Sequence, residues 1–130
     1  MADHPNAELF RRGYVAFQTG DLDTVRSLFA PDIVWHVPGH SHLAGDYRGV
    51  DDVIAQFMRN FEETNGTFKV ELHDILANDE HAVALATASG EKDGRSMRDN
   101  YTHVVHIKDG KLTESWIFDQ NQDEVDAFWG

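Results

Sequence analysis

The sequence contains no cysteine. Disulfide bonds and thiolate metal ligands are therefore excluded, and a reducing compartment is permitted. The first residues carry neither the basic stretch nor the apolar stretch of a secretory signal. No apolar run approaches the length that a membrane-spanning helix needs. We therefore expect a cytoplasmic protein that does not insert into a membrane.

Basic residues are also scarce. The chain has 11 lysines and arginines against 23 aspartates and glutamates, which gives a formal net charge of −12. A field of this sign repels the phosphates of nucleic acids and anionic lipids. We expect neither nucleic acid nor membrane as a partner, and a neutral, apolar small molecule as the ligand. The charge is equally consistent with a role in solubility alone.

The remaining composition is that of a folded domain. The 130 residues are 41% hydrophobic and 11% aromatic, which is enough to bury a core in one unit. No repeat, low-complexity tract or linker divides them. We therefore predict a single domain over residues 1–130.

Apolar side chains recur at helical spacing in three segments of the first half of the chain. The predicted helices span residues 7–19, a short stretch from 21 to before 31, and a stretch from 49 or 51 to about 64. Gly20 is a plausible end for the first helix. Asp21 can cap the second helix, and Pro31 ends it because proline disfavours helix at the residue before it.

Alternating and short apolar runs dominate the second half. The predicted strands span residues 32–37, 67–78, 81–89, 96–108 and 111–120, with a loop over 38–49 and a short helical end over 123–130. Residues 81–89 are nearly all small and apolar, which predicts an interior strand packed on both faces. Asp109-Gly110 is a strong hairpin signal between the last two strands.

This order of elements predicts an α+β domain. A long, curved, mostly antiparallel sheet would wrap around the three helices of the first half. The result is a cone-shaped half-barrel with an apolar interior. The mouth of such a cone is a natural pocket for a small molecule.

Several local patterns along the chain resemble one known family. They are Gly20-Asp21-Leu22 after the first helix, Phe29-Ala30-Pro31-Asp32 leading into Trp35-His36, Ala44-Gly45-Asp46-Tyr47-Arg48-Gly49 before the third helix, Asp109-Gly110-Lys111-Leu112 in the last hairpin, Trp116 on the last strand, and Asp126-Ala127-Phe128-Trp129 in the tail. Together they resemble the nuclear transport factor 2-like superfamily, in its branch of SnoaL-like polyketide cyclases and ketosteroid isomerase-related proteins. The resemblance covers essentially the whole chain and implies the cone fold. It leaves the reaction open, because isomerases, cyclases, epoxide hydrolases, dehydratases and non-catalytic binding modules share this fold.

The resemblance implies four catalytic candidates. His36 stands where ketosteroid isomerase has its general-base aspartate, and His103 stands near that enzyme's protonated aspartic acid. Asp119 stands where SnoaL-like cyclases and limonene epoxide hydrolase-like enzymes carry a last-strand carboxylate that acts as base. Tyr14 lies within one residue of the isomerase's tyrosine on the first helix. Chemistry of this kind needs no cofactor, and we expect none.

These residue types suit acid–base chemistry. Burial of Asp119 in an apolar cone would raise its pKa toward the working range of a general base. A neighbouring histidine could orient the carboxylate, share its proton, or protonate an oxygen of the substrate. Such a pair supports abstraction of a proton next to a carbonyl group, with activation of a water as a second class of reaction. Isomerisation, cyclisation and hydration all fall within these classes.

Strand alternation, combined with the resemblance, predicts the pocket. Ser115, Ile117 and Asp119 share one face of the last strand, and Tyr101 and His103 share one face of the strand before it. The predicted ligand-binding residues are Val34, Phe57, Phe61, Tyr101, Val105 and Ile117 on the walls, with His40 and His42 in the loop at the mouth.

A non-catalytic ligand-binding or dimerisation module is the second hypothesis. Asp119 would then be an exposed carboxylate at a strand end, His36 and His103 would be hydrogen-bonded structural histidines, and Tyr14 would be helix packing. The arrangement of the polar groups distinguishes the two hypotheses. Convergence of two or more of them on one point favours chemistry, whereas scattered positions favour binding.

A metal-dependent enzyme is a third, minor hypothesis. His36, His40 and His42 lie within seven residues of one another, and an extended segment would place His40 and His42 on the same side. The nearest carboxylate is Asp46, and no glutamate follows at the interval that metal sites of this spacing use. We therefore predict that no metal binds, and that the histidines divide between strand and loop.

Large aromatic side chains mark the opposite face of the last strand. Trp116 and Phe118 alternate with Asp119 and so point away from the predicted pocket. Large aromatics on an outer face indicate a partner sheet. We expect a homodimer through the outer sheet face, an assembly that the family resemblance also implies.

Overall fold

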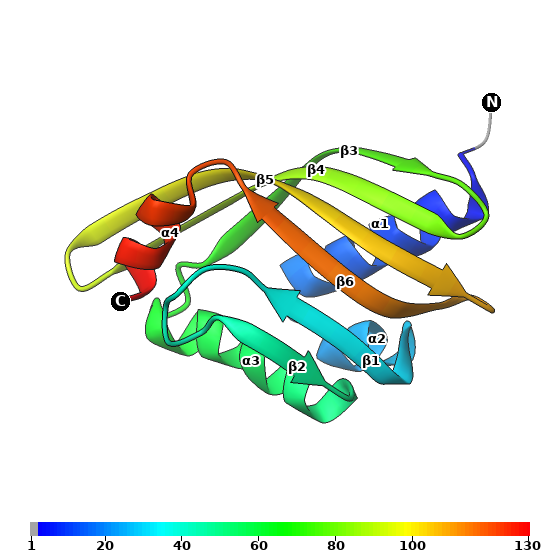
Figure 1. Cartoon of the computed structure of the whole chain (residues 1–130), viewed down its shortest axis with the longest axis horizontal. Helices are drawn as coiled ribbons and strands as arrows, with labels where there is room; N and C mark the ends of the chain where they lie inside the picture. The colour runs from blue at the N-terminus through cyan, green and yellow to red at the C-terminus, as the bar shows by residue number, and fades with distance from the viewer. Residues whose placement is uncertain (1–2) are drawn as a thin grey trace.

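The computed structural model describes residues 3–130. It is an α+β domain in which helices flank a single curved sheet (Figure 1). The helices are α1 (Pro5–Gln18), α2 (Leu22–Ser27), α3 (Val50–Glu63) and α4 (Gln122–Trp129). The strands are β1 (Phe29–Val37), β2 (Gly45–Arg48), β3 (Lys69–Ala77), β4 (His81–Lys92), β5 (Arg95–Lys108) and β6 (Lys111–Asp119). Within residues 3–130 there is no helix both long enough and apolar enough to cross a membrane.

The six strands lie in the order β2-β1-β6-β5-β4-β3. Strands β3 to β6 form an antiparallel meander, and β1 joins it in parallel alongside β6. The edge strands β2 and β3 do not pair with each other, so the curved sheet stays open. This architecture confirms the predicted half-barrel and its mostly antiparallel pairing.

Helices pack on one face of the sheet. Helix α1 contacts β3 and β4, helix α3 contacts β1 and β2, and α2 lies between the two helices. Every second residue of β4, the alanines from Ala82 to Ala88, is buried on this face. Small side chains there let α1 approach the sheet closely. Val83, Leu85 and Thr87, between these alanines, are only half-buried, which corrects the prediction of a strand packed on both faces.

Strand β1 begins earlier than predicted. It starts at Phe29 and runs through Pro31, although proline lacks the N–H that a strand interior requires. The pairing of β1 with β6 is irregular between Phe29 and Val34. Pro31 lies in this irregular stretch, where its missing donor breaks no ladder hydrogen bond.

The predicted loop over 38–49 contains a short strand. Residues Gly45–Arg48 form β2, which pairs antiparallel with β1. Four residues flanked by glycines carry too little alternation to predict a strand. The pairing matters for the site because it brings Asp46 opposite His36.

Helix α4 closes one end of the domain (Figure 1). The Asn121 side chain caps it by accepting a hydrogen bond from the backbone N–H of Glu124 at 3.2 Å. Phe128 and Trp129 at its end pack against Leu43 in a second, smaller hydrophobic cluster. The predicted helical end is therefore confirmed, and it joins the loop after β1 to the ends of β4 and β5.

Candidate active site

An apolar cavity of about 160 Å³ lies between the helices and the inner face of the sheet. Aromatic side chains from α1, α3 and β1 form most of its wall. They are Phe10, Tyr14, Phe17, Phe29, Trp35 and Phe57. The loop after β1 and helix α4 surround the mouth, where Pro38, Leu43, Val125 and Trp129 reach the cavity. Polar side chains enter this apolar space from β5 and β6 and also from the helices, with Tyr14 on α1 and Gln56 and Asn60 on α3.

Two carboxylates lie together near the mouth. Asp99 is on the inner face of β5 and is 5% exposed, and Asp119 is the last residue of β6. An Asp99 Oδ1 accepts a hydrogen bond from the backbone N–H of Gln120 at 3.1 Å. Burial first, then the hydrogen bond and negative charge of Asp99, raises the pKa of Asp119 to about 8. The pair therefore retains a proton at neutral pH.

A chain of neutral polar groups lies deeper in the same cavity. The Tyr14 hydroxyl is 3.0 Å from the Tyr101 hydroxyl and 2.9 Å from His103 Nδ1. On its other side, His103 Nε2 is 2.6 Å from Ser115 Oγ. These four residues come from α1, β5 and β6, so the chain crosses from the helix layer to the sheet. Tyr101 is also directly opposite Asp119 in the β5–β6 pairing.

His103 is a neutral imidazole. It is 4% exposed, and the rings of Phe10 and Trp35 meet it edge-on with centroids 4.9 Å away. Burial lowers the pKa of His103 to about 3. Burial likewise raises the pKa of Tyr14 and the pKa of Tyr101 above the ordinary tyrosine value. At neutral pH the deep end of the cavity is therefore uncharged.

The arrangement separates two kinds of polar group within one apolar space. Near the mouth a carboxylate pair can accept and return a proton. At the deep end, phenol and imidazole groups can hydrogen-bond an oxygen of a ligand. Together they can support proton transfer to and from a neutral molecule.

Comparison with known proteins places the chain in a family. Residues 10–115 match the SnoaL-like domain. The chain belongs to the SnoaL-like family. An uncharacterised protein of Mycobacterium tuberculosis is 32% identical over 130 residues, which is 99% of each chain.

Solved structures agree with this assignment. Bal32a, from a soil-derived mobile gene cassette, is 35% identical and superposes with a TM-score of 0.93 over 96% of both chains. An NTF2-like protein of Burkholderia xenovorans is 19% identical, with a TM-score of 0.82 over 100% of this chain and 99% of that one. The second likeness concerns the fold alone. The SnoaL-like domain thus has the NTF2-like fold that its sequence patterns predicted.

The SnoaL-like cavity brings together several of the predicted site residues. Those that line it are Tyr14, Phe57, Tyr101, His103, Ile117 and Asp119. Two further wall candidates lie elsewhere in the core. Phe61 packs against Phe17 and Phe68 with centroids 5.1 and 6.1 Å away, and Val105 is fully buried one inward position beyond His103. Neither of them lines the cavity.

His36 and Val34 lie on the outer face of the sheet, which corrects the expectation that they face the cone. Trp35, between them in β1, takes the inward position and lines the cavity. His36 Nδ1 is 2.7 Å from an Asp46 carboxylate oxygen, and His36 Nε2 is 2.7 Å from a Glu114 carboxylate oxygen. Its ring stacks on Trp116. The larger apolar side chain is buried and the polar one is left at the surface.

The three clustered histidines are directed to different partners. His40 Nδ1 is 3.6 Å from an Asp126 carboxylate oxygen at the surface, whereas His42 Nε2 is 2.7 Å from Glu63. His36 lies apart from both on the outer face. Within residues 3–130, no group of three or more histidine, aspartate or glutamate side chains is arranged to hold a metal ion. The three histidines therefore do not converge on one point.

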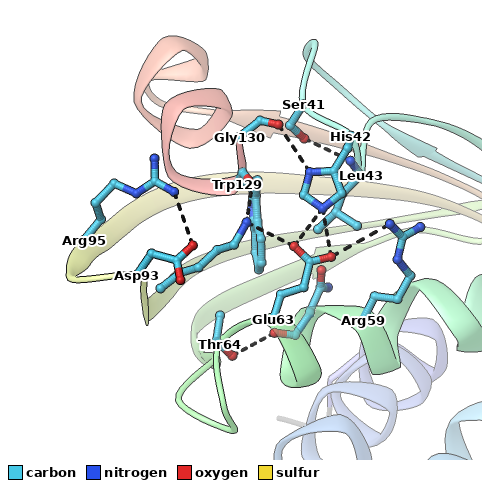
Figure 2. A network of polar contacts seen from close by, with 12 residues as sticks. Ser41, His42, Leu43, Arg59, Glu63, Thr64, Asp93, Arg95, Trp129 and Gly130 are labelled. Atoms are coloured by element: carbon cyan, nitrogen blue, oxygen red, sulfur yellow. Dashed lines mark hydrogen bonds and ion pairs between the residues drawn. The ribbon is translucent and has the colours of Figure 1, made fainter.

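A polar network joins helix α4 to the rim of the cavity (Figure 2). His42 lies between Glu63 at the end of α3 and the carbonyl of Gly130, which is 3.3 Å from its Nδ1. Lys92 donates a hydrogen bond to the carbonyl of Trp129 and pairs with Glu63 at 3.2 Å. Burial alone would raise the pKa of Glu63, but hydrogen bonds from His42 and Lys92 lower it. The network holds the end of α4, where Trp129 lines the cavity.

Two site residues, Asp99 and Ser115, were not predicted as functional. Alternation along β5 places Asp99 on the same face as Tyr101 and His103, and alternation along β6 places Ser115 with Asp119. Ser115 was already on the predicted inward face of β6 and only its contact with His103 was missed, whereas extending the inward face of β5 by one position reaches Asp99.

Proposed function

We propose that this SnoaL-like domain is an acid–base enzyme that moves a proton at a carbon next to a carbonyl group. Its substrate would be a small, neutral, largely apolar molecule held in the cavity. The observation that carries the proposal is convergence: the Asp99–Asp119 pair and the Tyr101 hydroxyl face one apolar space. No cofactor is needed for this step. The cytoplasmic location stays a prediction from the sequence.

The carboxylate pair supplies the base in this proposal. A catalytic group works best when its pKa lies near the working pH, and the pKa of Asp119 is raised to about 8. The ionised oxygen of the pair takes the proton from carbon, and the C–H electron pair moves into the Cα–C bond. The carbonyl π electrons move to oxygen, giving an enolate. The pair then returns a proton to a carbon of the substrate.

The cavity limits the size of the substrate. Its volume of about 160 Å³ is close to that of engineered cavities of about 150 Å³ that bind benzene. One ring with a short substituent therefore fits the enclosed part, and a longer molecule would extend through the mouth. The carboxylates and the overall charge of −12 disfavour an anionic substrate.

Acetophenone in D₂O provides a direct test. Its methyl protons lie next to a carbonyl, and their exchange for deuterium follows enolate formation without any net reaction. We expect the protein to accelerate this exchange, and Asp119→Asn and Asp99→Asn each to reduce it by about 10²- to 10⁴-fold. Asp109→Asn, at the exposed β5–β6 turn, is the matched control and should exchange like the wild type. Binding of acetophenone without any acceleration would contradict the proposal.

A non-catalytic ligand-binding module is the second candidate. One observation favours it: Tyr14, Tyr101, His103 and Ser115 already hydrogen-bond one another. A preformed polar chain of this kind can select a ligand without changing it. Tight binding of acetophenone by wild type and by Asp119→Asn, with background exchange in both, would establish this function instead.

We also propose that the protein forms a homodimer through the outer face of the sheet. Phe118 and Leu76 project from this face and are each 57% exposed. Trp116, two residues before Phe118 on β6, lies on the same face and is half-buried. Large exposed side chains on one sheet face are typical of an interface. A second copy would cover them without touching the cavity on the opposite face.

A further inference from the structure

Ser115 is a buried hydroxyl with one polar neighbour. It lies on the inner face of β6 and is 0% exposed. Its Oγ is 2.6 Å from His103 Nε2, and within residues 3–130 it makes no other side-chain hydrogen bond. The chemistry described above does not use it. Its position nevertheless decides how hydrogens are arranged along the whole polar chain.

The Ser115 hydroxyl donates to His103. A hydroxyl hydrogen needs an acceptor, and a buried donor without one is costly. If His103 Nε2 carried the hydrogen instead, Ser115 would accept it and its own hydrogen would have no partner. Nε2 is therefore the unprotonated nitrogen. Because burial keeps this imidazole neutral, its single hydrogen is on Nδ1.

The tautomer of His103 sets the donor and acceptor in each of the next hydrogen bonds toward the cavity. His103 Nδ1–H donates to the Tyr14 oxygen at 2.9 Å. The Tyr14 hydrogen is directed to the Tyr101 oxygen at 3.0 Å. Tyr14 is the only side chain within residues 3–130 that hydrogen-bonds the Tyr101 hydroxyl. The Tyr101 hydrogen is therefore left for whatever occupies the cavity that Tyr101 lines.

We infer that Ser115, His103 and Tyr14 are positioning residues that present the Tyr101 hydroxyl as a hydrogen-bond donor to the ligand. The ligand therefore needs an acceptor oxygen, such as a carbonyl, at this point. With the chain reversed, Tyr101 would offer only its lone pairs and would select an alcohol or another donor. The inference rests on the proposed function for one step only, in which Tyr101 stabilises the enolate oxygen.

The tautomer of His103 tests the inference without any ligand. Two-bond ¹H–¹⁵N correlation spectra of the full-length protein with ¹⁵N-labelled histidine distinguish the protonated ring nitrogen from the bare one. We expect Nδ1–H for His103 at neutral pH. An Nε2–H tautomer or an imidazolium would overturn the inference.

Two substitutions test the part played by Ser115. In Ser115→Ala the donor to Nε2 is absent, so we expect the Nε2–H form of His103 to become populated. Ser115→Thr keeps the hydroxyl and should keep the wild-type tautomer. Pure Nδ1–H in Ser115→Ala would show that Ser115 does not set the direction. If either variant fails to fold, the wild-type spectrum still decides the direction of the chain.

Acetophenone and ethylbenzene form a matched pair of probes for Tyr101, because only the first has an acceptor oxygen. We expect the infrared carbonyl stretch of bound acetophenone to shift as it does with a hydrogen-bond donor, and the shift to disappear in Tyr101→Phe. That variant should weaken acetophenone binding by roughly 2- to 10-fold and leave ethylbenzene binding unchanged. Equal losses for both probes, or an unshifted carbonyl, would count against the inference.

These measurements separate the inference from the proposed function. An Nδ1–H tautomer and a shifted carbonyl stretch, without deuterium exchange, would support the inference and contradict the proposed enzymatic function. Deuterium exchange together with an Nε2–H tautomer would support the enzymatic function and contradict the inference.

Discussion

Asp99 and Asp119 lie on neighbouring antiparallel strands and share the inner face of the sheet, where the negative charge of Asp99 helps hold a proton on Asp119. Two carboxylates in one apolar space cannot both ionise freely. This relationship gives the site a proton that can be moved at neutral pH. It also makes the stability of the fold depend on pH.

Asp119→Asn should remove part of that dependence. The pKa of Asp119 is raised to about 8 in the folded protein, against about 3.9 for an unfolded aspartate. Between these values the folded state binds a proton that the unfolded state does not. Stability from this group is therefore complete below about pH 4 and is lost as the pH rises toward 8. At pH 8 we expect the free energy of unfolding of the variant to exceed that of wild type by on the order of 1–2 kcal/mol, with solvent screening included.

Urea unfolding at pH 5, 6.5 and 8 measures this effect. The free energy of unfolding of Asp119→Asn should change less across the series than that of wild type. Asp109→Asn is the control, because Asp109 is exposed at a turn away from the cavity. Parallel curves for wild type and Asp119→Asn would mean that Asp119 ionises as an ordinary aspartate.

His103 should make the fold sensitive to acid. Burial lowers the pKa of His103 to about 3, whereas an unfolded histidine has a pKa of about 6.5. The unfolded state therefore binds a proton first, and stability is lost as the pH falls from 6.5 toward 3. We expect a loss of about 2 kcal/mol between pH 6.5 and 4.5, and a shallower loss in His103→Gln. Urea unfolding at these two pH values measures the loss of stability. An equal loss in wild type and His103→Gln would contradict the prediction.

His36 should respond in the opposite direction. The hydrogen bond with Glu114, followed by that with Asp46, raises the pKa of His36 despite partial burial. Its contribution to stability is complete below about pH 6.5 and is lost as the pH rises through the higher folded pKa. Glu114→Gln should therefore cost about 0.5–1 kcal/mol at pH 5.5 and less at pH 9. An NMR titration in which the pKa of His36 stays the same in Glu114→Gln would refute this prediction.

His36 also shows how far sequence reasoning reached. Alternation correctly put Trp35 and His36 on opposite faces of β1. The resemblance to ketosteroid isomerase suggested His36 for the inner face, but a buried tryptophan stabilises the core more than a buried histidine. The partners that hold His36 outside, Asp46 and Glu114, come from strands that the local pattern could not pair with β1.

Asp99 shows a different obstacle. The order of helices and strands was predictable because periodicity is a local property. Asp99 lies in a polar stretch after a turn, so its own neighbours suggest an exposed residue. Its burial depends on Gln120, just after β6, and on helix α4, which follow it by some twenty residues. Alternation along β5 gives the face on which Asp99 lies, but the contacts that bury it are not encoded in the spacing of side chains along one strand.

Phe118→Asp should disrupt the proposed homodimer. Phe118 is 57% exposed on the outer face of the sheet, so an aspartate there leaves the core intact. We expect the variant to sediment as a monomer where wild type sediments as a dimer. Val15→Asp is the matched control, since Val15 is 49% exposed but lies on helix α1. A wild-type monomer, or a Phe118→Asp dimer, would exclude this interface.

Gly39→Ala tests how firmly helix α4 is held against the mouth. Gly39 has a φ of +96°, and an added Cβ would collide with the side chains of Asp126 and Gln122 on α4. Gly94 has a φ of +78° but nothing within 4 Å of an added Cβ. Alanine at Gly94 therefore introduces only backbone strain, whereas alanine at Gly39 adds a steric conflict.

The difference between the two variants isolates that conflict. We expect Gly39→Ala to lower the free energy of unfolding by about 1–2 kcal/mol more than Gly94→Ala does. The atoms at the clash are the ends of the flexible Asp126 and Gln122 side chains, which must turn away and give up their hydrogen bonds to His40 and Pro38 in the loop. Because the loop is then held less firmly to α4, acetophenone binding should also weaken in Gly39→Ala and stay unchanged in Gly94→Ala. Urea unfolding and an acetophenone titration measure the two effects. Equal destabilisation with unchanged binding would mean that the loop and α4 separate freely, and that the mouth is not set by their contact.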